Sequence, residues 1–494
     1  MRKKLPIFYS ALMLTGVNLL LRFVGTSFQV FLSSRIGAAG IGLLQLVMSV
    51  GSLTMGAGIG GIRTATMYLT AEELGRKKPQ NVVWVLSGCF LYSICFSGCV
   101  AALLYHFAPW VASVWIGDPR TVEALRLFAA FLPITCLCGV MTGYFTAANR
   151  IGTLAAVEVV EQLCSMALTL GALTLFAGHD PVRSCMCVIM GSSLGSVLTL
   201  VCLIVLRMRE HAPTGQRIHV RSRLFQTALP LAVADDLKTG INTVENLMVP
   251  KRLALNAAIS SPLAAFGMVS GMVFPVIMFP AAILFALTEL LIPELARCAA
   301  AGSEKRIHYL VRKALRVALV YGITISGLLF LLSDMLCLTL YQNLDAASYM
   351  RAYALLIPML YCDIITDAMT KGLGQQKICV CYNIFTSFLD VVFLYLLLPC
   401  YGMDGYFISF LVTHLINFLL SLRRLLRITV KSISLRTPLL SVAAMIFGIW
   451  AASYVPNIYF RFVSFLLILD SLLFLLGILR RDDIIWAKGL LYKK

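Results

Sequence analysis

Four ionisable side chains interrupt an otherwise apolar segment at residues 228–252, ALPLAVADDLKTGINTVENLMVPKR, namely Asp235, Asp236, Lys238 and Glu245. Three of them, together with Asn242, recur at i, i+3, i+7 and i+10, which places them on one face of a helix. Turning these charges toward lipid would cost on the order of 10 kcal/mol, at about 2.5–3.5 kcal/mol for each residue. The stripe is therefore predicted to line a hydrated cavity.

A second polar stripe lies in the first apolar segment, at Thr15, Asn18, Arg22 and Gln29. When the two halves of the sequence are aligned, Arg22 and Lys238 come within one residue of each other. Two cations that face one cavity suit an anionic substrate such as a phosphate or diphosphate headgroup. We therefore expect Arg22 and Lys238 to bind the substrate, with Asn18, Gln29 and Asn242 beside them.

Carboxylates recur in other apolar segments. The candidates to bind a coupling cation, Na⁺ or H⁺, are Asp235, Asp236, Glu245, Asp363, Asp367, Asp390, Glu158 and Glu161. Loading a carboxylate changes which conformation of a protein is stable, so such groups can couple an ion gradient to movement. The alternative is a structural ion pair along one helix, as Asp235 could form with Lys238, or Asp367 with Lys371.

The composition supports a membrane location for these segments. The chain has 494 residues, of which 60% are hydrophobic and 13% charged, and its mean hydropathy is +0.88. Soluble domains contain about one quarter charged residues, so this balance indicates an integral membrane protein. The apolar runs are continuous rather than short and alternating, which predicts spanning helices and not a transmembrane β-barrel.

At about 20 residues per crossing, the runs predict helices at 7–31, 42–67, 83–107, 121–147, 153–177, 183–206, 225–250, 262–290, 308–333, 348–371, 378–399, 404–424, 438–455 and 461–479. The two halves resemble each other faintly, in parallel: FLPITCLCGVMTGYFTAANRIG at 131–152 matches LIPMLYCDIITDAMTKGLGQQK at 356–377, with Pro133 opposite Pro358. The predicted fold is an all-α polytopic membrane protein of about 14 transmembrane helices, with two pseudo-symmetric six-helix lobes around a central cavity plus two C-terminal helices.

This repeat also predicts the domain organisation. The N-lobe spans 1–206, a basic cytoplasmic loop 207–224, the C-lobe 225–427, and the last two helices with a basic cytoplasmic tail 428–494. The N-terminal run is too long for a signal peptide, contains Arg22 and lacks a convincing cleavage site, so we expect a retained helix.

The net charge of +18 is distributed unevenly between alternate loops. Roughly 30 Lys and Arg residues fall on one side and roughly 7 on the other, as expected of cytoplasmic loops. This pattern predicts a bacterial cytoplasmic membrane protein with both termini in the cytoplasm, its basic loops facing anionic membrane lipids and binding no nucleic acid.

Motifs for soluble-type catalysis are missing from the sequence. It has no P-loop, and its 15 cysteines form no C-x-x-C and lie mostly in apolar runs, where they are expected to act as small fillers. Asp363-x-x-x-Asp367 resembles an acidic motif of membrane prenyltransferases, but no second motif accompanies it. We therefore predict a protein that is not an enzyme and that needs no cofactor or resident metal.

Several stretches together resemble the multidrug/oligosaccharidyl-lipid/polysaccharide exporter superfamily, and within its polysaccharide transporter branch the stage V sporulation protein B group. They are LLLRFVGTSFQVFLSSRIGAAGIGLLQL at 19–46, MTGYFTAANRIGTLAAVEVVEQL at 141–163, ALPLAVADDLKTGINTVENLMVPKRL at 228–253, FGMVSGMVFPVIMFPAAILFALTELLIPELA at 266–296 and LRRDDIIWAKGLL at 479–491.

The resemblance implies a flippase that moves lipid-linked saccharides across the cytoplasmic membrane by alternating access. For the sporulation group, the implied cargo is a peptidoglycan precursor on an undecaprenyl diphosphate carrier, used in spore cortex or cell-wall synthesis. Arg22 is the residue carried over from the family. The sequence departs from relatives that flip the peptidoglycan precursor at Phe28 and Gln29, where they have a second Arg, and at Cys164 and Ser165.

Two other functions stay open. A cation-coupled multidrug antiporter of the same superfamily would need a carboxylate but not Arg22. A non-transporting membrane scaffold for cell-wall synthesis enzymes would tolerate neutralisation of the cavity charges but not changes in its surface loops.

Overall fold

The computed structural model describes residues 7–59, 61–76, 78–177, 180–209, 221–429 and 436–478, and their side chains except at 7–15, 18, 151, 177, 221–235 and 458–459. Helix is the only regular secondary structure within these ranges, which confirms the predicted all-α class. Most of the basic loop 207–224 and the tail from 479 lie outside the described residues.

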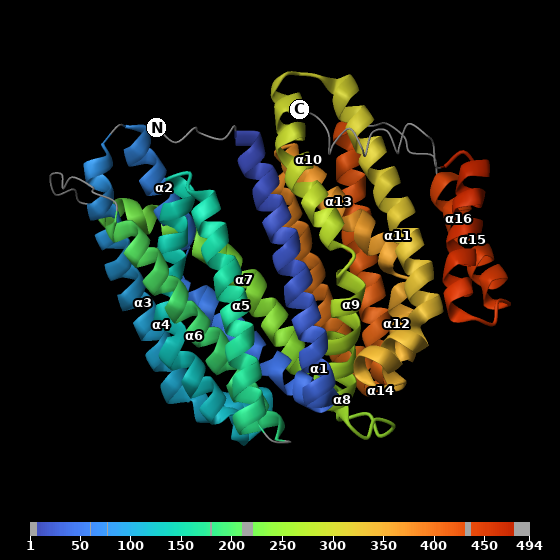
Figure 1. Cartoon of the computed structure of the whole chain (residues 1–494), viewed down its shortest axis with the longest axis horizontal. Helices are drawn as coiled ribbons and strands as arrows, with labels where there is room; N and C mark the ends of the chain where they lie inside the picture. The colour runs from blue at the N-terminus through green and yellow to red at the C-terminus, as the bar shows by residue number, and fades with distance from the viewer. Residues whose placement is uncertain are drawn as a thin grey trace. The chain divides into compact units, whose positions relative to one another are not determined.

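The first half of the chain forms seven long helices (Figure 1), which are α1 (Ile7–Ile59), α2 (Ile62–Gly75), α3 (Val82–Trp110), α4 (Val122–Ala147), α5 (Ile151–Ala172), α6 (Pro181–Met208) and α7 (Arg221–Leu253). The second half forms α8 (Pro262–Gly267), α9 (Phe274–Met278), α10 (Ala282–Ala300), α11 (Glu304–Tyr341), α12 (Asp345–Ala354), α13 (Ile357–Gly372), α14 (Gln376–Thr429), α15 (Arg436–Ser453) and α16 (Ile458–Leu475). Short π-helical segments extend α3 at Val111–Ile116 and α5 at Leu173–Ala177, and another joins α8 to α9 at Met268–Val273.

Helices α1 and α14 are each kinked at a single glycine. Gly37 in α1 has φ 78° and ψ 173°, and Gly402 in α14 has φ 57° and ψ −131°. A side chain disfavours positive φ, so glycine suits both points. The sequence predicts one helix at 7–31 and a second at 42–67; the structure places the break between them at Gly37.

Two predicted helices are broken. The segment 262–290 divides into Pro262–Met278 and Ala282–Ala300, which meet at 59°, and 348–371 divides into Asp345–Ala354 and Ile357–Gly372, which meet at 52°. Pro358 sits in the first turn of α13, where its missing N–H needs no partner, whereas Pro133 lies inside the continuous helix α4. The two prolines that the repeat aligns therefore have different structural roles.

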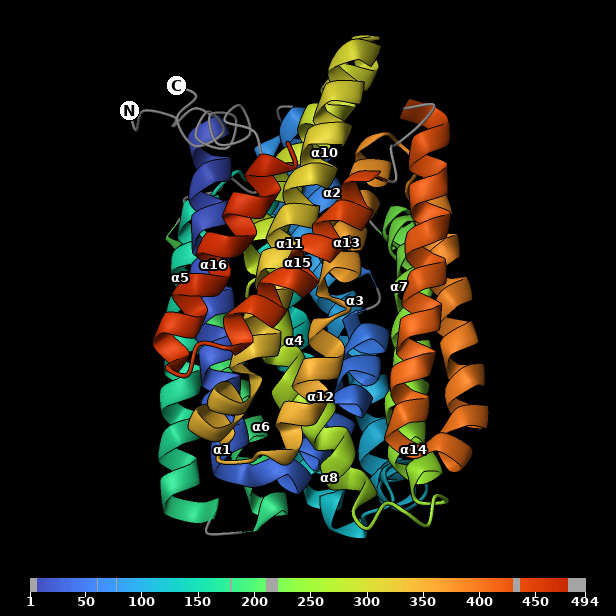
Figure 2. The same ribbon diagram turned by 90° about the vertical axis from the view of Figure 1, so that its right-hand side faces the viewer.

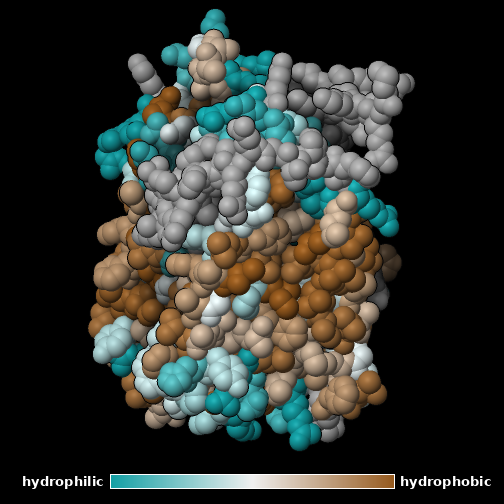
Figure 3. Space-filling view, turned by 90° about the vertical axis from the view of Figure 1, so that its left-hand side faces the viewer, coloured by the Kyte–Doolittle hydropathy of each residue, from teal (hydrophilic) through white to brown (hydrophobic). Residues whose placement is uncertain are grey.

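Within the described residues, eight helices are long and apolar enough to cross a membrane, or up to ten if each bent pair is one span. One of these eight is the segment Leu19–Gly75, which comprises most of α1 together with α2 and has 57 residues; another is α14, which has 54 residues. Both are kinked at a glycine, so each has the length of two crossings. Together with α7 and α16, these segments agree with the predicted architecture of about 14 crossings. On the face shown in Figure 3, hydrophobic residues form a belt between two hydrophilic ends.

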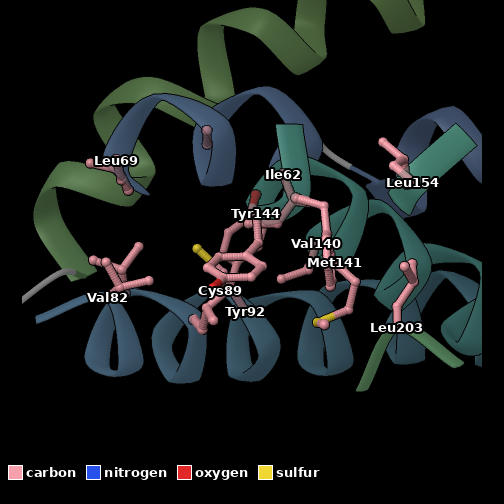
Figure 4. Packing of buried hydrophobic residues seen from close by; sticks show 14 residues of the cluster. Ile62, Leu69, Val82, Cys89, Tyr92, Val140, Met141, Tyr144, Leu154 and Leu203 are labelled. Atoms are coloured by element: carbon pink, nitrogen blue, oxygen red, sulfur yellow. The ribbon is translucent and has the colours of Figure 1, made fainter. Parts of the chain in front are cut away.

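The chain divides into two compact units: residues 1–28 with 35–267, and residues 29–34 with 268–494. This division follows spatial contacts, whereas the predicted lobes follow the sequence repeat, so the predicted boundaries stay a prediction. In the first unit, α2, α3, α4 and α6 enclose a buried cluster that includes Ile62, Cys89, Met141 and Leu203 (Figure 4). Burial of these side chains fixes the helices that carry the polar residues of this unit.

In the second unit, α11 packs against α12, α13 and the pair α15–α16, and α13 packs against α14. Figure 2 shows α15 and α16 crossing the outer side of α11. A buried cluster that includes Ile323, Met445, Phe465 and Leu469 holds this pair on α11. The C-terminal pair is therefore an appendage of the second unit, as the sequence repeat predicts.

Candidate functional site

Helix α7 packs into the first unit through Thr243 and Asn246. The Thr243 hydroxyl donates a hydrogen bond to the Ser49 carbonyl at 3.1 Å, and Asn246 Nδ2 donates to Ser49 Oγ at 3.0 Å. Lys238 and Asn242 are exposed, and Glu245 is half-buried. The side chain of Asp235 lies outside the described residues. The packing of α7 thus leaves Lys238 and Asn242 at the surface of the unit.

Asp236, which the sequence places beside the stripe, turns toward α1. A Cβ atom added at Gly56 would lie 2.8 Å from its carboxylate Oδ1, so the carboxylate lies close against α1 at this glycine. Asp236 also acts electrostatically on the buried Tyr92 of α3. This carboxylate is therefore held within the first unit and does not continue the exposed stripe.

Arg22 is exposed on α1, and its helix approaches α5 nearby, because a Cβ at Gly25 would lie 3.5 Å from Gln162 Nε2. Gln29, half-buried, belongs to the second unit, and the side chain of Asn18 lies outside the described residues. The first unit therefore carries both predicted cations, Arg22 and Lys238, with exposed side chains.

Glu158 and Glu161 lie on α5, both half-buried. The charges that act on Glu158 include Arg63, an exposed residue at the start of α2, and Glu161. Arg63 was not among the predicted site residues. Gly60 and Gly61 precede Arg63 in the sequence, and Gly61, whose backbone is left-handed (φ 68°), is the N-cap residue of α2. A cation directly after a helix break is the signal that would have singled it out.

The second unit contains a polar cluster of buried and half-buried residues, which we call the α13–α14 cluster and define as Asp363, Thr386, Asp390, Ser409, Thr413 and Asn417. Asp390 is only 5% exposed, and both the Ser409 and Thr413 hydroxyls donate to its Oδ1, the latter at 3.2 Å. These residues lie on the two limbs of α14 that Gly402 separates. The glycine bend therefore brings the carboxylate of one limb against the hydroxyls of the other.

The same cluster extends to α13. Asn417 Nδ2 donates to Asp363 Oδ2 at 3.2 Å, and Thr386 Oγ1 lies 3.5 Å from Asn417 Oδ1. Asp363 Oδ1 is buried and, among the described residues, has no hydrogen-bond partner. A buried carboxylate oxygen without a donor is costly, and a bound cation or proton would remove that cost.

The sequence analysis identified Asp363 and Asp390 but missed their partners. Ser409, Thr413 and Asn417 recur at i, i+4 and i+8 in FISFLVTHLINF, which is a polar stripe on one helix face. Hydroxyl and amide groups carry no charge, so they stand out less in an apolar run than carboxylates do. The stripe is nevertheless a usable signal.

Asp367 makes an ion pair with Lys371, with Nζ 2.6 Å from Oδ2, one turn along α13. This is the structural alternative that the sequence leaves open for this residue. Among the described residues, no group of three or more His, Cys, Asp or Glu could hold a metal ion. The α13–α14 cluster instead offers carboxylate, hydroxyl and amide oxygens, which suit a hard cation.

This architecture, two compact helical units with polar groups inside membrane helices, can be compared with known proteins. A family model named MatE matches residues 14–170 and 253–396, more than half of the chain. The chain belongs to the MatE family. This confirms the predicted resemblance to the exporter superfamily, and proteins of the MatE fold described below are transporters.

Two relatives of this MatE protein come from Bacillus subtilis (strain 168). Stage V sporulation protein B is 22% identical over 355 residues, which cover 69% of this chain and 68% of that protein. Sporulation protein YkvU is 22% identical over 316 residues, which cover 61% of this chain and 68% of that protein. The sporulation group named from the sequence motifs is thereby confirmed as similar.

Solved structures share the fold at low sequence identity. A structure described as "Lipid II flippase MurJ, inward closed conformation" has a TM-score of 0.70 and 13% identity, and covers 96% of this chain and 100% of that one. An inward-facing multidrug resistance MATE family transporter of the MOP superfamily has a TM-score of 0.64 and 14% identity, and covers 83% and 98%. Both likenesses establish the fold, and the arrangement in two lobes agrees with it.

Proposed function

We propose that this MatE-family protein flips a lipid-linked oligosaccharide or peptidoglycan precursor, carried on undecaprenyl diphosphate, across the cytoplasmic membrane by alternating access. The similarity to stage V sporulation protein B and to a structure described as a lipid II flippase supports this cargo over others in the superfamily. In this proposal both termini face the cytoplasm, and the role lies in spore cortex or cell-wall synthesis.

One observation carries the proposal. Arg22 and Lys238 are exposed cations on membrane helices of the same unit, and α7 packs into that unit through Thr243 rather than through Lys238. Cations on membrane helices are expensive unless water or an anion reaches them. A diphosphate would accept two parallel hydrogen bonds from the guanidinium and a charge interaction from the ammonium. Asn18 and Asn242, in the same unit, would contact the remaining polar atoms of the headgroup, and Gln29 stays a sequence prediction.

The α13–α14 cluster would hold the coupling cation, Na⁺ or H⁺. Its oxygen donors fit Na⁺, and the unpartnered Asp363 Oδ1 fits a proton equally. Asp390 and Asp363 are the central residues of this role, whereas Asp367 already has a cation in Lys371. The remaining predicted carboxylates, Asp235, Asp236, Glu245, Glu158 and Glu161, belong to the first unit.

The second candidate function is a cation-coupled multidrug antiporter, which the similarity to the MATE transporter favours. It requires the α13–α14 cluster but not Arg22. A scaffold for cell-wall synthesis enzymes requires neither, so a protein with Arg22, Lys238 and Asp390 neutralised together would keep a scaffold's function.

The deciding experiment replaces Arg22 with Ala and with Lys and measures how much labelled lipid-linked precursor reaches the outer leaflet of proteoliposomes. Loss of charge-assisted hydrogen bonds worth about 1.5–3 kcal/mol predicts a fall of roughly 10- to 150-fold for Arg22→Ala, with partial retention for Arg22→Lys. Arg35→Ala, an exposed arginine further along α1, is the matched control and should behave like the unaltered protein. Unchanged flipping in Arg22→Ala at normal protein levels would contradict the proposal.

A further inference from the structure

Helix α16 carries a carboxylate, Asp470, at the middle of an apolar segment. It lies nine residues after Arg461 and ten before Arg480, which are the two cations that bound this segment. At 1.5 Å per residue, Asp470 is ~14 Å along α16 from Arg461. An ionisable group at this depth normally faces a bundle interior or a water-filled cavity.

Asp470 faces away from its own unit. The opposite side of α16, formed by Phe465, Leu469 and Leu473, is fully buried. The Phe465 ring fills the space above Gly327 of α11, where an added Cβ would lie 2.1 Å from the ring, and it also contacts Gly448 of α15. This interlocking prevents α16 from turning its carboxylate inward.

The exposed side of α16 has the spacing of a helix-packing seam. Val463, Leu467, Asp470 and Phe474 follow at steps of four, three and four residues, and the three apolar members are 48%, 64% and 55% exposed. A repeat of 3.5 residues is the pattern by which one helix packs along another. Asp470 is itself exposed at the centre of this seam, and among the described residues its carboxylate makes no hydrogen bond or ion pair.

We propose that this seam binds a transmembrane helix of a partner protein, and that the partner helix carries a lysine or arginine that pairs with Asp470. Polar side chains bind membrane helices to one another because their alternative is an unpaired group in hydrocarbon. The midpoint of the apolar segment is about 15 Å from either headgroup layer, so a cationic lipid headgroup does not reach the short aspartate side chain.

A second copy of this chain fits the seam poorly. A two-fold symmetric contact places the same patch on both subunits. On α15 and α16 the only cations in the described ranges are Arg436 and Arg461, and Arg461 Nε already donates to the Val455 carbonyl at 3.0 Å. Two copies would therefore bring aspartates, and no cation, to the middle of the membrane.

The test uses a benzophenone amino acid at Leu467, in the full-length protein in its native membranes, with the same probe at the exposed Leu396 of α14 as control. Ultraviolet light should produce a covalent adduct from position 467 with one membrane protein that has Lys or Arg within a spanning helix. Asp470→Asn should lower the adduct yield at least tenfold, Asp470→Glu should preserve it, and Asp404→Asn, an exposed aspartate between the limbs of α14, should have no effect.

Charge exchange then decides whether the adduct reports the proposed pair. Asp470→Lys should abolish the adduct, and replacing the partner's cation with Asp should restore it in the Asp470→Lys protein. The proposal is overturned if no adduct forms, if the adduct is a second copy or lipid alone, if Asp470→Asn leaves the yield unchanged, or if charge exchange fails.

Folding and transport are measured separately. Because Asp470 is exposed, Asp470→Asn should keep the wild-type thermal midpoint in detergent and full flipping by the purified protein in liposomes. Loss of either would assign Asp470 to folding or to transport and would overturn the proposal.

Discussion

Neutralising Asp390 should separate ion coupling from folding. In Asp390→Asn the amide oxygen still accepts hydrogen bonds from Ser409 and Thr413, and the shape of the side chain is nearly unchanged. What disappears is the negative charge at a position that is 5% exposed. The variant is therefore expected to fold normally and to lose its response to the coupling cation.

The cost to stability follows from the local hydrogen bonds. A bond to a charged acceptor contributes about 1.5–3 kcal/mol and a bond to a neutral one about 0.5–1.5 kcal/mol, so two bonds lose roughly 2 kcal/mol. Removing a buried charge offsets part of this loss. The Thr413 hydroxyl also has the Ser409 carbonyl as an alternative acceptor, at 2.8 Å. We expect the free energy of unfolding to change by less than about 2 kcal/mol.

The assay is thermal unfolding of the purified protein in NaCl and in choline chloride at equal ionic strength. A cation bound at ten times its Kd stabilises the folded state by about 1.4 kcal/mol, so sodium should raise the wild-type midpoint. The Asp390→Asn midpoint should be the same in both salts, while the control Asp404→Asn should respond as the wild type does. If Asp390→Asn kept the full sodium response, the assignment of the cation site to this cluster would be refuted.

Two further predictions concern the first unit. Gly267→Ala should lower the free energy of unfolding by about 1–3 kcal/mol or more, and with it the thermal midpoint. The reason is that the added Cβ would lie 1.9 Å from the Ala38 carbonyl oxygen. The control is Gly98→Ala, where the added Cβ meets no atom within 4 Å, and it should be neutral or stabilising. In the loop between α3 and α4, hydrogen bonds from Arg120 hold the pKa of Asp118 below its ordinary value. The lowered pKa stabilises the folded protein above the pKa of Asp118 in the unfolded state, and this stabilisation is lost as pH falls through its pKa in the folded state. Asp118→Asn should therefore lower the free energy of unfolding by at most about 1 kcal/mol at pH 7, and the difference from the wild type, measured by thermal unfolding, should shrink below about pH 4.

The spanning segments could be predicted from the sequence because a helix in hydrocarbon must be apolar and satisfies its own backbone hydrogen bonds, and the bilayer thickness sets its length. The joints between them could not. The helices predicted at 7–31 and 42–67 in fact meet at a kink at the single residue Gly37, a position that the hydrophobic pattern does not mark. Likewise Pro133 and Pro358 look equivalent in the repeat, but only packing decides that one stays inside a helix and the other starts one.

Charged residues in apolar runs could be recognised from the sequence, because a charge in hydrocarbon is costly and therefore rare. Arg22, Lys238, Asp363 and Asp390 were identified in this way. Their partners depended on the tertiary structure. The bend at Gly402 brings Ser409 and Thr413 to Asp390, and the crossing of α13 with α14 brings Asn417 to Asp363. Helical periodicity places a side chain on a face of its own helix, but only the packing of that helix decides whether the face meets another protein group, water or lipid.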